Sequence, residues 1–203
     1  MRKYPLSVWL VPALAAVWVV GCSKSSLSTP KDAAKTFATA LVNGDTETAN
    51  KASTGADPKT VESLVKAASN MKKLQDAAVA KFGDQGKDVS GGGEESNFAD
   101  LPKKLDDAEV TQTGDTATVT PKNGRPLKLK KVGDDWKVDM SEMASGPMAS
   151  MAGAMFDSMG KAAAETTDEV NAGKYKSVGE LRDAMQKKMM GAALGSVKGP
   201  GPQ

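Results

Sequence analysis

The methionines between residues 140 and 159 are the side chains of this chain best suited to binding something. Met151, Met155 and Met159 follow one another at four-residue steps, which places them on one face of a helix, and Met148 lies one turn earlier. Soft thioether sulfur is a ligand for Cu(I), so Met151, Met155 and Met159 could form a copper site. The same stripe would also suit a docking surface for another protein, or ordinary packing beside alanines and glycines. The sequence leaves these three interpretations open.

Three carboxylates, Asp106, Asp107 and Glu109, form the densest acidic group beside a predicted strand. A pair of carboxylates can act as acid and base when burial separates their pKa values. Neighbouring residues of a strand point to opposite faces, so Asp106 and Asp107 could not easily share one proton. Acids in turns also commonly cap helices or face water. We therefore expect no catalytic role for this group.

The chain contains no histidine. Histidine general bases, Ser-His-Asp triads and histidine metal sites are thereby excluded. Residues 91–95 read Gly-Gly-Gly-Glu-Glu, but they lack the lysine and hydroxyl ending of a phosphate-binding loop and the alternating acids of a calcium loop. We expect a flexible loop there, and a protein that has no cofactor and is not an enzyme.

Trp136 is a second candidate for ligand binding. Its indole could stack on a small hydrophobic ligand, although a tryptophan that alternates with apolar residues is typical of a core. We expect Phe37, Phe82 and Leu129 as its neighbours.

Three helices are predicted before the extended segments. Thr29 and Asp32 form a capping box around Pro30, and Asp45 can cap a short second helix. The longest periodic segment begins at Pro58, and Gly83 is expected to end it.

Between residues 108 and 140 the apolar pattern alternates. Turn residues at 114–115, 123–124 and 133–135 divide this region into four runs, which is typical of an antiparallel meander. Ala108 and Val110 are expected on the core side. Two helices follow, one over 147–172 and one led by the capping box of Ser177 and Glu180, and residues 191–203 are predicted to be disordered. The expected fold is α+β, with N-terminal helices packed on a four-stranded antiparallel meander and two C-terminal helices.

The first twenty-two residues have the pattern of an export signal. Arg2 and Lys3 precede an apolar run from Leu6 to Val20, which is shorter than the roughly 20 residues of a bilayer-spanning helix. The run ends in Val19-Val20-Gly21-Cys22, which resembles the lipobox of bacterial lipoproteins. The resemblance implies that residues 1–21 are cleaved and that Cys22 receives a diacylglycerol and anchors the chain in the membrane.

The same resemblance implies a location. Ser23 stands where enteric lipoproteins retained in the inner membrane carry aspartate, which favours the periplasmic face of the outer membrane. Of the 27 basic side chains, Arg2 and Lys3 leave with the signal, so the mature chain has as many basic as acidic side chains, 25 of each. It has no basic field that would recruit nucleic acid.

The middle of the chain resembles a second group. Long helices followed by a meander with Gly114-Asp115-Thr116 and Gly133-Asp134-Asp135-Trp136 resemble the nuclear transport factor 2-like (cystatin-like) α+β cone over residues 29–140. Enzymes of that fold place an acid, tyrosine or histidine inside the cone, and residues 29–140 contain neither tyrosine nor histidine.

The sequence thus predicts five parts: a signal (1–21), a polar tether (22–28), a cone-like domain (29–140), a helical appendage (141–190) and a tail (191–203). The expected function is that of a lipid-anchored envelope protein that binds another envelope protein or a small hydrophobic ligand. The alternatives are Cu(I) handling through the methionines and an enzyme on the cone-like scaffold.

Mass spectrometry of the protein purified from its native membrane tests the anchor. The mature chain is expected to begin at Cys22 and to carry fatty acyl chains, because two or three such chains hold a protein stably in a bilayer. An unmodified Cys22 thiol, or recovery of the protein from the cytosol, would show that the lipobox interpretation is wrong.

Overall fold

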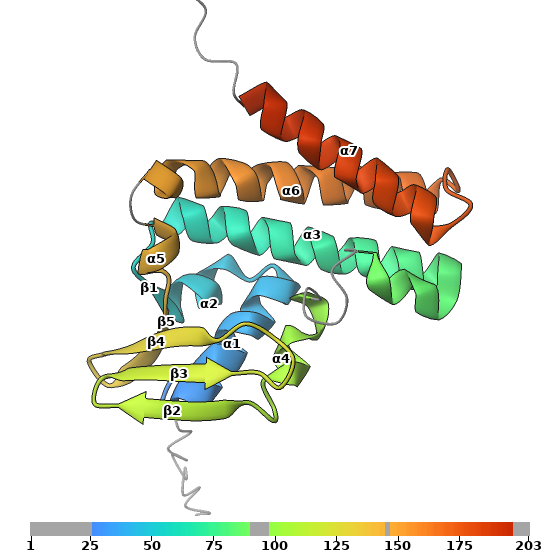
Figure 1. The fold of residues 1–203 in the computed structure, drawn as a ribbon. Coiled ribbons are helices and arrows are strands. Elements are labelled where there is room, and N and C mark those ends of the chain that lie inside the picture. Colours follow the sequence, from blue (N-terminus) through green and yellow to red (C-terminus); the bar gives the residue numbers. More distant parts are fainter. Residues whose placement is uncertain (1–25, 90–97, 145–146, 197–203) are drawn as a thin grey trace, which may run out of the picture.

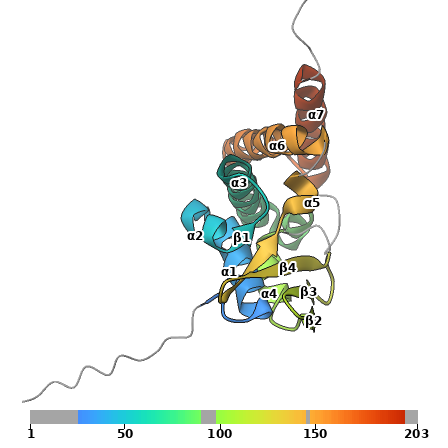
Figure 2. The same ribbon diagram turned by 90° about the vertical axis from the view of Figure 1, so that its left-hand side faces the viewer.

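The computed structural model describes residues 26–89, 98–144 and 147–196, and it shows a sheet at one end of the molecule and a stack of helices above it (Figure 1). α1 (Pro30–Asn43) lies against the sheet, and α2 (Thr46–Lys51) follows it. α3 (Pro58–Phe82) packs on α1, α6 (Pro147–Asn171) packs along α3, and α7 (Val178–Ser196) is the outermost helix. The view in Figure 2 shows the same succession from the side.

The sheet has five strands in the order β1-β5-β4-β3-β2. Their bounds are β1 (Ser53–Thr54), β2 (Glu109–Thr113), β3 (Thr116–Thr120), β4 (Leu127–Val132) and β5 (Asp135–Asp139). The pairs from β2 to β5 are antiparallel, whereas β1 runs parallel to β5. The fold is therefore α+β, but the prediction of a four-stranded, purely antiparallel sheet is wrong.

The sequence did not predict β1 because this strand is only two residues long. A strand this short has no alternating pattern, and its existence depends on the partner beside it. The N–H of Val138 donates to the carbonyl of Ala52 over 2.9 Å, and the N–H of Met140 donates to that of Thr54 over 2.8 Å. The N–H of Trp136 donates to the carbonyl of Leu27 over 2.8 Å, which holds the start of the described chain beside β5.

The strand farthest from β1 corrects a second expectation. Ala108 is buried, but Val110 in β2 is 41% exposed, and all five residues of β2 are exposed. α1 contacts β3, β4 and β5, so the helical cover lies over the other half of the sheet. The alternating pattern predicted that Val110 lies on the apolar face of the sheet, but it could not predict whether a helix covers that face at β2.

The predicted helix starts are confirmed. The N–H of Asp32 donates to Thr29 Oγ1 over 3.1 Å, and that of Thr48 donates to Asp45 Oδ1 over 3.0 Å. At the start of α7, the N–H of Glu180 donates to Ser177 Oγ over 3.2 Å. Such caps satisfy amide groups that the first helical turn leaves without partners, and they depend only on nearby residues.

Short elements complete the chain. A 3-10 helix η1 (Gly83–Asp88) follows α3, and η3 (Phe98–Asp100) leads into α4 (Leu101–Lys104) before the sheet. α5 (Ser141–Ala144) connects β5 to α6. α7 continues to Ser196, so residues 191–196 are helical, although the sequence predicted disorder from 191. The signal, Cys22 and the glycine loop at 91–95 lie outside the described residues. Within the described ranges, no helix combines the length and apolar character that crossing a bilayer requires.

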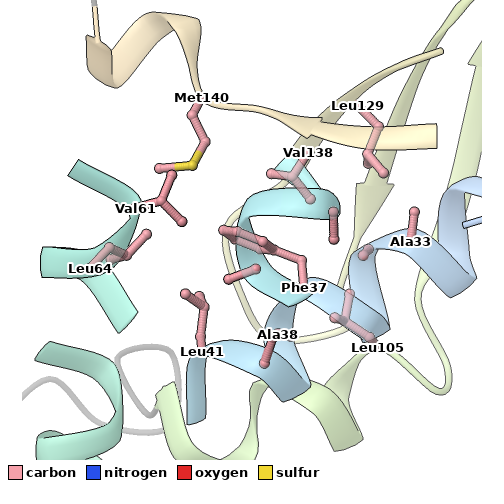
Figure 3. Packing of buried hydrophobic residues seen from close by; sticks show 14 of the residues in the cluster. Ala33, Phe37, Ala38, Leu41, Val61, Leu64, Leu105, Leu129, Val138 and Met140 are labelled. Atoms are coloured by element: carbon pink, nitrogen blue, oxygen red, sulfur yellow. The ribbon is translucent and has the colours of Figure 1, made fainter. Parts of the chain in front are cut away.

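The main core lies between the sheet, α1 and the first half of α3. Phe37 of α1 is at its centre, with Val61 and Leu64 of α3 on one side and Leu129 and Val138 of the strands on the other (Figure 3).

A second core lies at the far end of α3. Leu74 of α3, Ala163 of α6 and Leu181 of α7 are fully buried there. Phe82 packs against this second core, so the expectation that it neighbours Trp136 is wrong. The reason is the length of α3, since 25 residues span about 37 Å and Phe82 is the last of them.

α3 and α6 approach each other closely at Gly160. A Cβ atom on Gly160 would lie 3.1 Å from the Cα atom of Ala67, which is tighter than ordinary van der Waals contact. The amide of Asn70 donates to the carbonyl of Gly160 over 3.1 Å. A position without a side chain is therefore needed where the two backbones meet.

Two matched substitutions on α6 test this contact. Gly160→Val is expected to lower the free energy of unfolding by about 1–3 kcal/mol more than Gly153→Val, because its side chain would push α6 away from the α3 backbone. Gly153 is the control, since a Cβ there would meet nothing nearer than Thr60 Oγ1 at 4.0 Å. Urea unfolding of both variants measures the difference, and equal losses would contradict the proposed close approach.

Candidate functional site

The acidic group beside β2 is solvated. Asp106 forms an ion pair with Lys35 of α1, and both side chains are well exposed. The hydrogen bond and charge of the Lys35 ammonium lower the pKa of Asp106. Asp107 and Glu109 are exposed as well. A general acid needs a carboxyl group that stays protonated near neutral pH, so this arrangement gives no support to acid–base catalysis.

An open pocket of about 560 Å³ lies along the outer side of α1. Most of its lining residues are of polar type, among them Asp32, Lys35 and Thr36. These groups already have partners in the chain: Asp32 accepts from Thr29, Lys35 binds Asp106, and Thr36 Oγ1 donates to the carbonyl of Ser26 over 3.1 Å. Asp32 and Lys35, two of the charged side chains that line the pocket, are therefore already engaged within the chain.

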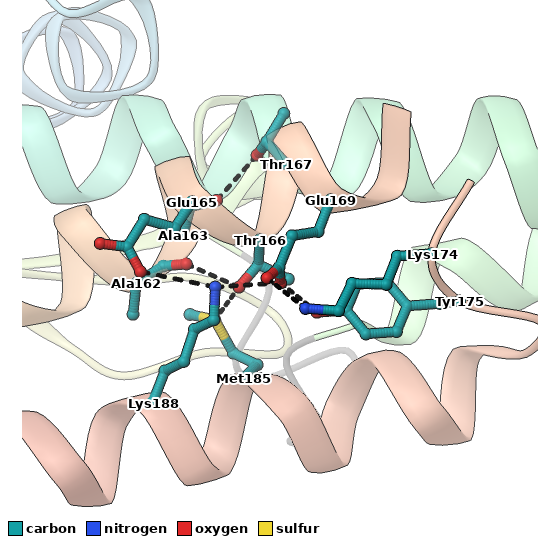
Figure 4. A network of polar contacts seen from close by, with 10 residues as sticks. All are labelled: Ala162, Ala163, Glu165, Thr166, Thr167, Glu169, Lys174, Tyr175, Met185 and Lys188. Atoms are coloured by element: carbon teal, nitrogen blue, oxygen red, sulfur yellow. Dashed lines mark hydrogen bonds and ion pairs between the residues drawn. The ribbon is translucent and has the colours of Figure 1, made fainter. Parts of the chain in front are cut away.

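A polar network joins α6 to α7 (Figure 4). The carboxylate of Glu169 accepts from Lys174 Nζ at 2.6 Å, from Lys188 Nζ at 3.0 Å and from the hydroxyl of Tyr175. Lys188 Nζ also lies 3.4 Å from Glu165 Oε2. Lys174 and Tyr175 come from the connection between the helices, while Lys188 comes from α7. Glu169 thus ties the turn and α7 to α6.

The electrostatics of this network are those of a structural clamp. Hydrogen bonds from Lys174, Tyr175 and Lys188 lower the pKa of Glu169 to about 2. Burial, together with the hydrogen bond to Glu169, raises the pKa of Tyr175 to about 12. Both values lie far from neutral pH, so neither group is suited to exchange a proton there. The sequence did not predict this network, because its members come together only when α7 folds back along α6.

α7 covers only one half of α6. Ala162 and Thr166 of α6 are buried, and Thr166 Oγ1 lies 3.8 Å from the sulfur of Met185 in α7. Toward the N-terminus, steps of three and four residues lead from Ala162 through Met159 to Met155 and Met151. These residues therefore continue the face on which α7 lies.

The continuation of this face is uncovered. Met155 is 61% exposed and Met151 is 63% exposed, and we call these two residues the methionine stripe. Met159 differs, because it is half-buried and packs against the main core. Met148 belongs to the first turn of α6, but its side chain is outside the described part of the structure. The three evenly spaced methionines therefore do not share one environment.

α7 leaves α6 after Lys188. Met185 is buried, whereas Met189 is 40% exposed and Met190 is 59% exposed. Figure 1 shows α7 rising away from α6 toward its C-terminal end. We call residues 189–196 the α7 free end. Met151 and Met155 of α6, and Met189 and Met190 of α7, are thus exposed apolar residues on neighbouring helices.

Trp136 is 3% exposed and belongs to the main core, together with Phe37 and Leu129. It does not line the pocket along α1. The structure therefore places Trp136 apart from the methionine stripe, and a ligand that stacked on its indole would have to enter the core.

No family model, curated protein or solved structure matches this chain. The resemblances to lipoproteins and to the nuclear transport factor 2-like cone therefore stay predictions, and function has to be inferred from the residues themselves.

Replacing Glu169 by glutamine tests the clamp. The lowered pKa of Glu169 stabilises the fold above about pH 4.5, and this contribution is lost as the pH falls toward 2. Glu169→Gln is expected to cost about 1–2 kcal/mol at pH 7, less than the full pKa shift implies because water reaches the group. Thermal unfolding measured from pH 7 to pH 2 should show the difference from the unmodified protein shrinking.

Glu47→Gln is the matched control, since Glu47 pairs only with Lys51 in an exposed ion pair. Its melting temperature should follow that of the unmodified protein at every pH. A Glu169→Gln protein with the same pH profile as this control would contradict the clamp.

Proposed function

We propose that this protein is a lipid-anchored, non-enzymatic docking module of the bacterial cell envelope, which binds an amphipathic helix of another polypeptide on the methionine stripe. The observation that carries the proposal is that Met151 and Met155 extend the α6 face on which α7 packs, yet are more than half exposed. An apolar stripe that continues a helix-binding face is suited to bind a further helix.

The half of α6 that α7 covers indicates which kind of helix fits. The buried residues Val178, Leu181 and Met185 of α7 follow one another at steps of three and four residues, and the last two belong to the core shared with α6. The methionine stripe carries no charged side chain, so the bound helix needs an uncharged apolar face. Methionine is unbranched and polarizable, which lets such a surface adapt to the side chains of its partner.

The position of Cys22 in the chain suggests how the molecule would be oriented on the membrane. Leu27 is held beside β5, and Cys22 lies only a few residues earlier in the chain. The sheet and α7 are at opposite ends of the molecule (Figures 1 and 2). An anchor at Cys22 would therefore set the sheet end toward the membrane and turn α6 and α7 toward the periplasm.

Cu(I) handling is a second candidate, favoured by one observation. Met151 and Met155 place two exposed thioethers on successive turns of α6. Leucine separates the two functions, because it preserves the apolar surface but removes the sulfur ligands.

A labelled peptide with the sequence of Val178–Ser196 serves as the probe helix, and fluorescence anisotropy measures its binding to the full chain in detergent. The double variant Met151→Lys/Met155→Lys is expected to weaken binding at least about tenfold, roughly 1.4 kcal/mol, because docking would bury unpaired ammonium groups. Met151→Leu/Met155→Leu should retain binding.

The control variant is Val110→Lys/Val132→Lys, which changes two exposed apolar residues of the sheet. It should bind the peptide like the unmodified protein. Equal binding by the stripe variant and this control would reject the docking site. The copper candidate would instead be supported if the protein does not bind the peptide, and if it binds Cu(I) but loses this binding in Met151→Leu/Met155→Leu.

A further inference from the structure

The α7 free end has the properties that the methionine stripe requires of its partner. Residues 189–196 read Met-Met-Gly-Ala-Ala-Leu-Gly-Ser and contain no charged residue. They directly follow Lys187 and Lys188. Met189, Met190 and Gly191 are exposed in the described structure. The exposed start of this uncharged segment therefore lies beyond the part of α7 that α6 covers.

The spacing places this end on the correct side of its helix. Leu181 and Met185 of α7 are buried in the core that α7 shares with α3 and α6, and Val178 is buried at the next position toward the start of the helix. The next positions on that face, four and seven residues after Met185, are Met189 and Ala192. The face by which α7 binds α6 thus continues into the free end, just as the matching face of α6 continues into the methionine stripe.

One chain leaves both continuations uncovered, because α7 diverges from α6 after Lys188. We propose that two copies of this chain associate by exchanging these surfaces, so that the α7 free end of each copy packs on the methionine stripe of the other. This inference rests on the proposed docking function and names its partner. A two-fold arrangement covers both stripes and both free ends at once, and such an isologous contact closes on itself.

The α6–α7 contact within the chain is the template for this interface. The two helices are joined by the short connection 172–177, in which Gly173 adopts a left-handed conformation with φ of 79°, and they run antiparallel (Figure 1). A partner helix placed the same way would lie antiparallel over the first half of α6. The helix dipoles then oppose each other, and no charged side chain of either surface is buried.

Membrane anchoring favours the same association. A two-fold axis perpendicular to the membrane keeps both Cys22 anchors on one side, while the helical layers meet above it. Two copies held on one membrane surface also meet at a higher effective concentration than two copies free in solution. The exposed stripe is therefore suited to self-association in the place where the anchor would put the protein.

Analytical ultracentrifugation of the full lipidated chain in density-matched detergent tests the inference. The unmodified protein is expected to sediment as a dimer that dissociates on dilution. Met155→Lys and Met189→Lys should each raise the dimer dissociation constant at least about tenfold, because either one places a charge in the shared interface. Val132→Lys on β4 should leave the dimer dissociation constant unchanged. The α6 variant and the α7 variant should both keep the melting temperature of the unmodified protein, because the replaced side chains are exposed.

Cysteine substitution identifies the contact itself. A Met155→Cys copy mixed with a differently tagged Met189→Cys copy should form a disulfide-linked heterodimer under mild oxidation. Neither variant oxidised alone should give this product at a comparable level. If a single chain carrying both substitutions forms only an intrachain disulfide, then the free end closes on its own stripe and the two-copy inference is overturned.

The outcomes also separate this inference from the docking proposal. A chain that stays monomeric at all concentrations but binds the α7 peptide through Met151 and Met155 overturns the second copy as partner and retains the docking site. A monomer that does not bind the peptide overturns both. A dimer that neither lysine variant weakens also overturns the exchanged interface.

Discussion

The packing of α3 against both of its neighbours is the contact on which the rest of the structure depends. Its first half contributes Val61 and Leu64 to the core between the helices and the sheet, and its second half contributes Leu74 to the core shared with α6 and α7. Gly160 permits α6 to lie against the backbone of α3 at Ala67. The position of the methionine stripe is therefore set by α3, which does not itself contribute a residue to it.

The clamp at Glu169 has a consequence for the surface beyond it. Glu169 binds Lys174 of the turn and Lys188 of α7, which fixes α7 at the C-terminal end of α6. The N-terminal end of α6 is left uncovered by α7. Apolar surface that stays in water forgoes roughly 25 cal/mol for each Å² that burial would remove. α7 covers only half of the apolar face of α6. Binding of another helix to the uncovered half would bury this apolar surface and so stabilise the complex.

The carboxylates of Asp106 and Glu169 have partners that account for their lowered pKa values. Asp106 is held ionised by Lys35, and the pKa values of Glu169 and Tyr175 are displaced away from neutrality in opposite directions. Groups used in acid–base catalysis are displaced toward the working pH instead. The electrostatics therefore fit a protein whose polar contacts hold helices together, which is consistent with the proposed docking role.

The sequence alone determined the features that depend on neighbouring residues. The caps at Thr29, Asp45 and Ser177 follow from hydrogen bonds within a few residues, and the α+β class follows from the change of apolar period. Only the tertiary structure decided which apolar faces are covered. Met151, Met155 and Met159 share one spacing, yet Met159 packs against the core while the other two are exposed. The two-residue β1 and the exposed Val110 have a related explanation. The apolar spacing along a helix or strand shows which of its faces is apolar. Whether another segment pairs with it or covers that face depends on the path of that segment.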